Sequence, residues 1–214
     1  VIEPVIFMDA NMESTVRDIL QCEPSHILYT NDLWQITELT VPDDVTTLED
    51  LQHMTYLETL TLNGRSMSNL NDLSELTHLK KLDLTGCRFS ADSLATVASL
   101  PALQELNLTD CGLSTLAGLE HATGLIKLDL TSNTIRNLEP LKDLTRLQEV
   151  ILAHNAVTDL TVLGGLPNLV KLDISHNTVS SLSPIALCSK LTNLNAANNQ
   201  IIDASAASSM PILA

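Results

Sequence analysis

The sequence predicts an α/β repeat fold, a right-handed solenoid with one curved parallel sheet. Three observations support this prediction. The motif LxxLxLxxN recurs along the chain, its copies are evenly spaced, and the composition is 44% hydrophobic but only 2% aromatic. A core that avoids aromatic residues must be filled by many similar aliphatic side chains, which suits a stack of identical units. The chain is therefore expected to be a leucine-rich repeat protein.

The copies of the motif place the strands. LIKLDLTSN and LVKLDISHN are the clearest, and ITELTVPDD is a degenerate first copy. The blocks end at positions 44, 65, 87, 111, 133, 155, 177 and 199, in steps of 21, 22 or 24 residues. Each LxL core alternates apolar and polar residues, which predicts a short strand with one buried face. We expect about eight strands, centred near residues 39, 60, 82, 106, 128, 150, 172 and 194.

The segments between the strands predict mostly 3₁₀ turns on the convex side. Apolar residues fall there at every third position, as at Ile135, Leu138 and Leu141, and this spacing matches a 3₁₀ turn better than an α-helix. The 24-residue step contains SADSLATVASL. Ser90 as N-cap and an apolar face with Leu94 predict one genuine α-helix there.

The last position of each block predicts a ladder of buried polar groups. A buried amide of Asn133, Asn155, Asn177 or Asn199 can bond the backbone groups that the turn leaves free. Cys87 and Cys111 occupy the same position. They either form a disulfide or stay as free buried thiols, and we expect free thiols because their side chains point inward side by side. Cys188 aligns with leucines and is expected in the core.

Residues 1–35 predict a helical N-terminal cap that covers the first repeat. Asp9 or Asn11 can cap a helix with one apolar face, and TNDLWQI predicts a second short turn. The apolar face of the first helix consists of Met12, Val16, Ile19 and Leu20. Residues 36–214 form the repeats of the same continuous domain, and the chain is expected to stop inside a repeat because SMPIL aligns with GLPNL.

A known family shows the same features. The run IFMDANMESTVRDIL, then NDLWQITEL and LEDLQHMTYLETLTL, resembles the helical cap and first repeats of bacterial internalin-like surface proteins. LDLTSNTIRNLEPLKDLTRL is similar to their 22-residue repeat, a type also seen in the intracellular regulator of eukaryotic protein phosphatase 1. The resemblance implies a surface-anchored adhesin or host-interaction protein that binds proteins on its concave face. The chain departs from the family pattern in lacking concave aromatic residues, in its low lysine content and in its 24-residue repeat.

Charge and motifs exclude several functions. A formal net charge of −15 argues against nucleic acid and against anionic membranes, and no apolar run is long enough for a transmembrane helix. The sequence contains no Ser-His-Asp, phosphate-loop or HExxH pattern, so we expect neither enzyme activity nor a cofactor. His154 and His176 fall in one column of adjacent repeats and form a weak candidate pair for a metal, without an evident third ligand.

The third and fifth positions of the motif are expected to face outward on the concave side. The third column alternates in sign from Lys81 to Lys171, which is either a recognition surface or a device for solubility and weak cross-strand pairing. The candidate partner-binding residues are Lys81, Asp83, Glu105, Asn107, Lys127, Asp129, Glu149, Ile151, Lys171 and Asp173. With Glu38, these two columns hold six acids and three lysines, which favours a basic or neutral partner.

The partner is most simply a protein, with a glycan as an alternative, and the chain is expected to be monomeric. A flank is the alternative site, where Trp34 and Tyr56 are candidates for exposed aromatic residues, although for Trp34 we favour packing against the cap. Three functions stay open: an extracellular or cell-surface bacterial recognition protein, a cytoplasmic scaffold that binds an enzyme such as a phosphatase, and the targeting arm of a larger enzyme.

Overall fold

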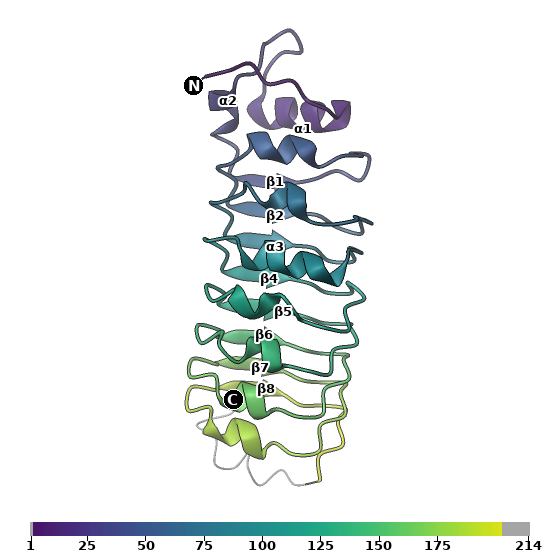
Figure 1. The fold of residues 1–214 in the computed structure, drawn as a ribbon, viewed down its shortest axis with the longest axis vertical. Helices are drawn as coiled ribbons and strands as arrows, with labels where there is room; N and C mark the ends of the chain where they lie inside the picture. The colour runs from purple at the N-terminus through teal and green to yellow at the C-terminus, as the bar shows by residue number, and fades with distance from the viewer. Residues whose placement is uncertain (1, 203–214) are drawn as a thin grey trace.

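The computed structural model describes residues 2–202, and it is a stack of coils, each contributing one strand to a single sheet (Figure 1). All eight strands are parallel and lie in sequence order. Their bounds are β1 Glu38–Thr40, β2 Thr59–Thr61, β3 Lys81–Asp83, β4 Glu105–Asn107, β5 Lys127–Asp129, β6 Glu149–Ile151, β7 Lys171–Asp173 and β8 Asn193–Asn195. The central residue of every strand is the one that the motif predicts, so the repeat frame is confirmed.

The register keeps equivalent motif positions side by side. Leu39 pairs with Leu60 and Leu60 with Leu82, and the same match continues to Leu172 and Leu194. Because neighbouring parallel strands lie about 4.8 Å apart, each motif position becomes a column of closely spaced side chains. The middle position of every strand from β1 to β7 is buried, and Leu194 in β8 is half-buried.

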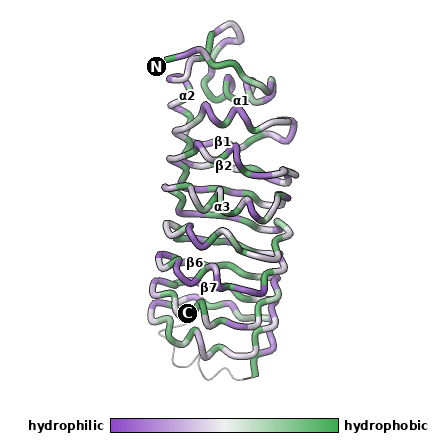
Figure 2. The backbone as a smooth tube through the Cα atoms, in the orientation of Figure 1, coloured by the Kyte–Doolittle hydropathy of each residue, from purple (hydrophilic) through white to green (hydrophobic). Residues whose placement is uncertain are grey.

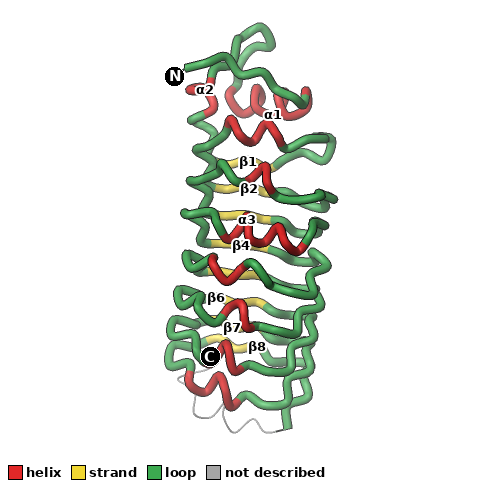
Figure 3. Tube along the Cα trace, in the orientation of Figure 1, coloured by secondary structure: helices red, strands yellow, loops and turns green. Residues whose placement is uncertain are grey.

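The convex side is built mostly from 3₁₀ turns, as predicted, and Figure 3 shows these short helical segments stacked along the long axis. They are η1 Glu49–His53, η2 Asn71–Leu73, η3 Ala91–Ser93, η4 Leu119–His121, η5 Glu139–Leu141 and η6 Ser183–Leu187. Two short α-helices accompany them, α3 Leu94–Ala98 and α4 Thr161–Gly164.

The prediction of one α-helix in the convex turns needs two corrections. The α-helix of the long repeat is α3, but it begins only at Leu94, after the 3₁₀ turn η3. Ser90 precedes η3 and its side chain makes no capping hydrogen bond. The second correction is α4, a single α-helical turn in a repeat of ordinary length. Gly164 at the end of α4 allows the next coil to pack closely against it, because a Cβ there would meet the carbonyl oxygen of Pro184.

The N-terminal cap consists of α1 Ala10–Leu20 and the short α2 Thr30–Leu33. Asp9 is the N-cap of α1, and its carboxylate accepts hydrogen bonds from the backbone N–H groups of Asn11 and Met12. Met12 and Val16 are fully buried, as predicted, whereas the prediction for Ile19 is wrong, because Ile19 is 44% exposed. The buried face of α1 is therefore narrower than the apolar pattern indicates.

Two buried carboxylates fasten the cap to the first coil. Asp50 accepts hydrogen bonds from the backbone N–H groups of Met8 and Asp9, at 2.8 and 2.9 Å. Asp9 in turn accepts two hydrogen bonds from Thr46, one from the backbone N–H and one from the hydroxyl. These hydrogen bonds hold the pKa of Asp9 well below its usual range. The cap is thus tied to the stack by charge-assisted hydrogen bonds as well as by apolar contact.

The core is one continuous column of aliphatic side chains, mostly leucine, that runs from Met12 in the cap to Leu191. Hydrophobic positions recur in every coil of the tube (Figure 2). Phe7 and Phe89 only pack against the edge of this core. The scarcity of aromatic residues therefore reflects a narrow interior in which every coil offers the same aliphatic-sized space.

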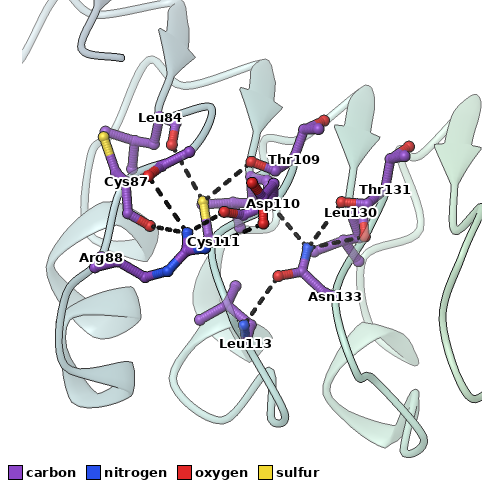
Figure 4. Close-up of polar contacts among 12 residues, drawn as sticks. Leu84, Cys87, Arg88, Thr109, Asp110, Cys111, Leu113, Leu130, Thr131 and Asn133 are labelled. Atoms are coloured by element: carbon purple, nitrogen blue, oxygen red, sulfur yellow. Dashed lines mark hydrogen bonds and ion pairs between the residues drawn. The ribbon is translucent and has the colours of Figure 1, made fainter. Parts of the chain in front are cut away.

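The asparagine ladder forms as predicted. The side-chain amide of Asn133 donates to the carbonyl of Leu108. It also donates to the carbonyls of Leu130 and Thr131, and its oxygen accepts from the N–H of Leu113 (Figure 4). Asn155, Asn177 and Asn199 repeat this pattern one coil further each time. Each amide therefore joins its own turn to the preceding coil.

Cys87 and Cys111 are free thiols in the same ladder, so the expectation of unpaired cysteines is confirmed. Their Sγ atoms donate to the carbonyls of Leu62 and Leu84, at 2.9 and 3.1 Å. Burial raises the pKa of Cys111 to about 12. Cys188 is buried in the core, as predicted.

Asp44, at the end of the first block, is exposed and outside the ladder, so the ladder begins at Arg65, which the sequence did not single out. Its guanidinium donates to three backbone carbonyls of the preceding coil, those of Val41, Pro42 and Val45. The residue before each ladder position is left-handed, from Gly64 at φ 64° to Asn198 at φ 55°.

Among residues 2–202, no helix is long and apolar enough to cross a membrane. The predicted partial repeat around Leu213 lies outside the described residues.

Candidate protein-binding surface

The candidate surface is the open face of the sheet, where the first and third residues of every strand point outward. The first residues form the column from Glu38 to Asn193, and the third residues form the column from Thr40 to Asn195. These residues are exposed or half-buried, whereas the central aliphatic residues of β1 to β7 are buried. The structure thus brings all ten predicted partner-binding residues onto one face. Their role in binding a partner stays a prediction.

The first-residue column forms ion pairs along the strands. Lys81 Nζ lies 2.9 Å from Glu105 Oε1, and Glu149 Oε1 lies 2.8 Å from Lys171 Nζ and 3.6 Å from Lys127 Nζ. In the described part of the chain no ion pair joins Glu105 to Lys127. The ladder of alternating charge is therefore two clusters, and Glu149 is the centre of the second.

The two lysines change the acidity of Glu149. Partial burial raises the pKa of Glu149, but the hydrogen bond from Lys171 and the charges of Lys127 and Lys171 outweigh it, so the pKa lies below its usual value. The same contact raises the pKa of Lys171. Both shifts favour the charged forms of Glu149 and Lys171, and the centre of the face places one acid between two lysines.

The third-residue column holds its carboxylates by local hydrogen bonds. Asp83, Asp129 and Asp173 each accept, through Oδ1, from the N–H and hydroxyl groups of the residue two positions later. Burial raises the pKa of Asp173, but the hydrogen bonds from Ser175 and Asn195 outweigh this effect, so the pKa of Asp173 lies below its usual value. These aspartates are oriented before any partner arrives.

The shape of the face adds an observation that the sequence did not supply. A shallow hollow of about 270 Å³ crosses β2 to β5, with Lys81, Asp83 and Asn107 among its polar lining. Ile151, the apolar residue of the predicted patch, is half-buried on β6 and lies outside this lining. The hollow is therefore offset toward the N-terminus from the patch around Ile151.

His154 and His176 are neighbours, as predicted, with stacked rings whose centroids lie 3.9 Å apart. Both residues have left-handed backbone conformations, φ 57° and 55°. His176 Nε2 also lies 3.0 Å from the side-chain nitrogen of Asn198. Within residues 2–202, no group of three or more His, Cys, Asp or Glu side chains is arranged to hold a metal ion.

The flank carries an exposed aromatic row that the sequence anticipated only in part. Trp34 and Tyr56 are exposed, and His78 stacks on Tyr56 with a centroid distance of 4.9 Å. His78 was missed, although it lies 22 residues after Tyr56 and therefore in the same column. A search of each column for ring-bearing residues would have found it.

Comparison with known proteins agrees with this architecture. Two leucine-rich repeat family profiles match the chain, "Leucine Rich repeats (2 copies)" over residues 145–187 and "Leucine Rich repeat" over residues 75–98. No curated protein sequence matches the chain.

Solved structures give a more specific likeness. An internalin C2 from Listeria monocytogenes has 29% sequence identity and a TM-score of 0.84, over 98% of this chain and 93% of its own. An internalin from the same species has 25% identity and a TM-score of 0.82, over 97% of this chain and 69% of its own. A leucine-rich repeat protein of Leptospira interrogans, at 22% identity and a TM-score of 0.70, covers 79% of this chain and 45% of its own and shows the fold alone.

The fold, the asparagine ladder and the family profiles define the class: the chain is a leucine-rich repeat protein, built like the modules that bind other proteins. Within that class its architecture is internalin-like, since the helical cap and the stack together match the Listeria internalins over nearly the whole chain.

Proposed function

We propose that this chain is a non-catalytic recognition module of a secreted or surface-attached bacterial protein, and that it binds a protein partner through the open face of its sheet. The observation that carries the proposal is the preset charge pattern on β5, β6 and β7. There Glu149 is held between Lys127 and Lys171, and Asp129 and Asp173 are fixed by their own turns. Preset polar groups lose little freedom on binding.

The centre of the proposed contact consists of Lys127, Asp129, Glu149, Ile151, Lys171 and Asp173. Ile151 is the apolar residue of this patch, and the charges around it supply a polar rim. Six acids against three lysines in the two columns favour a basic or neutral partner. Because opposite charges steer association, the association rate should fall as salt is raised.

Charge reversal tests the surface. A partner is first identified by affinity capture with the full-length protein, and its affinity is then measured for the variant Lys127→Glu, Glu149→Lys, Asp173→Lys. We expect affinity to fall by roughly tenfold or more, because several complementary contacts become repulsive at once. Unchanged affinity with an intact fold by circular dichroism would move the site off the sheet face.

A matched control separates local from overall charge. The variant Glu139→Lys, Lys142→Glu, Asp143→Lys makes the same change in net charge on the convex side, where Lys142 pairs with Glu139 at 2.8 Å. We expect it to bind like the parent protein. Location at the cell surface is tested separately, by the access of added protease to the protein on intact source cells. Full protection until lysis would contradict a surface position.

A further inference from the structure

The N-terminal flank carries a second surface that differs from the sheet face in chemistry. Trp34, Tyr56 and His78 form a continuous row, here called the aromatic row. The centroids of the Trp34 and Tyr56 rings lie 5.7 Å apart at a tilt of 51°, and those of Tyr56 and His78 lie 4.9 Å apart and stacked. The three rings therefore form one patch across consecutive coils.

The side chains of the aromatic row contact one another but lie outside the core. Trp34 is 47% exposed and Tyr56 is 42% exposed, although the interior of the stack is filled by aliphatic side chains. His78 Nδ1 lies 2.9 Å from the carbonyl oxygen of Thr55, which can only accept, so Nδ1 carries the proton and the ring is held in place. Ordered aromatic side chains that stay exposed are typical anchors of protein interfaces.

Other exposed apolar side chains are concentrated at the same end of the molecule. Among residues 2–202, ten large hydrophobic side chains are strongly exposed, and eight of them belong to residues 2–56. They include Ile6 at 81% and Met8 at 67%. Up to residue 202, where the described part of the chain ends, the later coils contribute only Leu187 and Ile202. The apolar surface available for docking is therefore at the cap and the first coils.

Charge at this end is also one-sided. Residues 1–64 contain twelve acids and a single base, Arg17, whereas residues 65–214 contain fourteen acids and ten bases. Two residues after Tyr56, Glu58 pairs with Lys80 at 2.7 Å while both side chains remain about half exposed. Nucleic acids and anionic membranes would be repelled by this end, and a cationic partner would be attracted.

We propose that the aromatic row and its acidic surroundings are a second docking surface, separate from the sheet face, for a basic protein segment that places aromatic or aliphatic side chains beside Lys or Arg. The apolar side chains of the segment cover the rings, and its cations meet Glu58. The rings supply most of the binding energy, because exposed carboxylates contribute little individually.

Selection of peptides tests the chemistry of the partner. Random linear peptides displayed on phage are selected on the immobilised protein, and the enriched peptides are synthesised. We expect them to combine Lys or Arg with aromatic or aliphatic residues. Trp34 is the only tryptophan of the chain, so peptides without tryptophan should change its fluorescence on binding. A failure to enrich peptides, or enrichment of neutral or acidic ones, overturns the proposal.

Variants test the position of the surface. By calorimetry, the enriched peptides should bind the variant Trp34→Ala, Tyr56→Ala roughly tenfold or more weakly. The variant Trp34→Phe, Tyr56→Phe should lose much less affinity, because it keeps two aromatic rings. The variant Leu187→Ala, the matched exposed apolar control, should bind the peptides like the parent protein. Glu58→Gln should weaken binding by about two- to fivefold, and more at low salt than at high salt.

Two further outcomes separate this surface from its alternatives. The sheet-face variant Lys127→Glu, Glu149→Lys, Asp173→Lys should bind the peptides normally, and loss of binding there would place them on the sheet face instead. Failure of the sheet-face proposal would leave the peptide result unaffected. Sedimentation of the parent protein should give a monomer. A dimer that dissociates in Trp34→Ala, Tyr56→Ala would show that a second copy, and not a basic partner, occupies the row.

Discussion

The early and the late coils fill the same ladder position with different chemistry. Asn133 and the asparagines after it each donate to backbone carbonyls and accept from a backbone N–H. In the earlier coils the position holds Arg65, Cys87 and Cys111, which only donate. Since all these coils have the same strand register, the position mainly requires a donor to the carbonyls of the turn. The acceptor function is an addition of the later coils.

A second division, between the cap with the first coils and the rest of the stack, appears in the surface of the molecule. Residues 1–64 carry most of the exposed apolar side chains and a strong excess of acids, while the coils after them carry nearly balanced charges, many of them in ion pairs. A repeat fold allows this, because each coil contacts only its neighbours and its surface can change without altering the stack.

The largest effect is expected in the late ladder. Asn133→Ala removes the donor to the carbonyls of Leu108 and Leu130 and the acceptor for the N–H of Leu113, leaving buried backbone groups unpaired. We expect a loss of about 3–5 kcal/mol in the free energy of unfolding, measured with urea. Asn63→Ala, at an exposed asparagine, is the control and should change stability by less than about 0.5 kcal/mol.

A smaller effect is expected in the early ladder. Cys87→Ala removes one sulfur donor to the carbonyl of Leu62 and leaves little empty space, so the loss should be about 1–2 kcal/mol. A loss of stability equal to that of Asn133→Ala would mean that the early and the late positions of the ladder contribute equally.

Thiol labelling of the parent protein tests the burial of the ladder cysteines without a mutation. Burial raises the pKa values of Cys87, Cys111 and Cys188, so these thiols should stay unreactive in the folded protein at mildly alkaline pH. Half-buried Cys22 should label first, and all four should label in urea.

The smallest effect on the whole stack is expected at the cap. Because the pKa of Asp9 is depressed in the folded protein, its stabilisation is fully present above the ordinary aspartate value of about 3.9 and is lost as the pH falls below it. Asp9→Asn should loosen the cap at pH 7, detected by Trp34 fluorescence, while the circular dichroism of the later coils changes little. The difference between the parent and the variant should narrow steadily as the pH is lowered from about 4 towards 2, because the stabilisation by the Asp9 carboxylate is lost progressively below its unfolded pKa. A difference that does not change over this range would mean that Asp9 acts through packing and not through its charge.

Periodicity explains why so much of the fold was predictable. Each strand needs only an LxL core in a repeat of nearly constant length, so the strand centres, the outward columns and the asparagine ladder could all be placed from the sequence. The same logic put Lys127, Glu149 and Lys171 in one column before their ion pairs were seen. Local pattern sufficed because every coil packs against a copy of itself.

Tertiary structure decided what depends on contacts between non-equivalent parts. Ile19 continues the apolar pattern of α1 yet is exposed, because the first coil covers only part of the helix. Arg65 serves the ladder because its side chain is long enough to reach three carbonyls of the previous coil, which no motif encodes. The gap between Glu105 and Lys127 depends on side-chain geometry and not on the order of charges. The sequence determined the positions of the strands and of the ladder. The packing of particular side chains determined which residues of the cap are buried, which charges form ion pairs and which surfaces stay exposed.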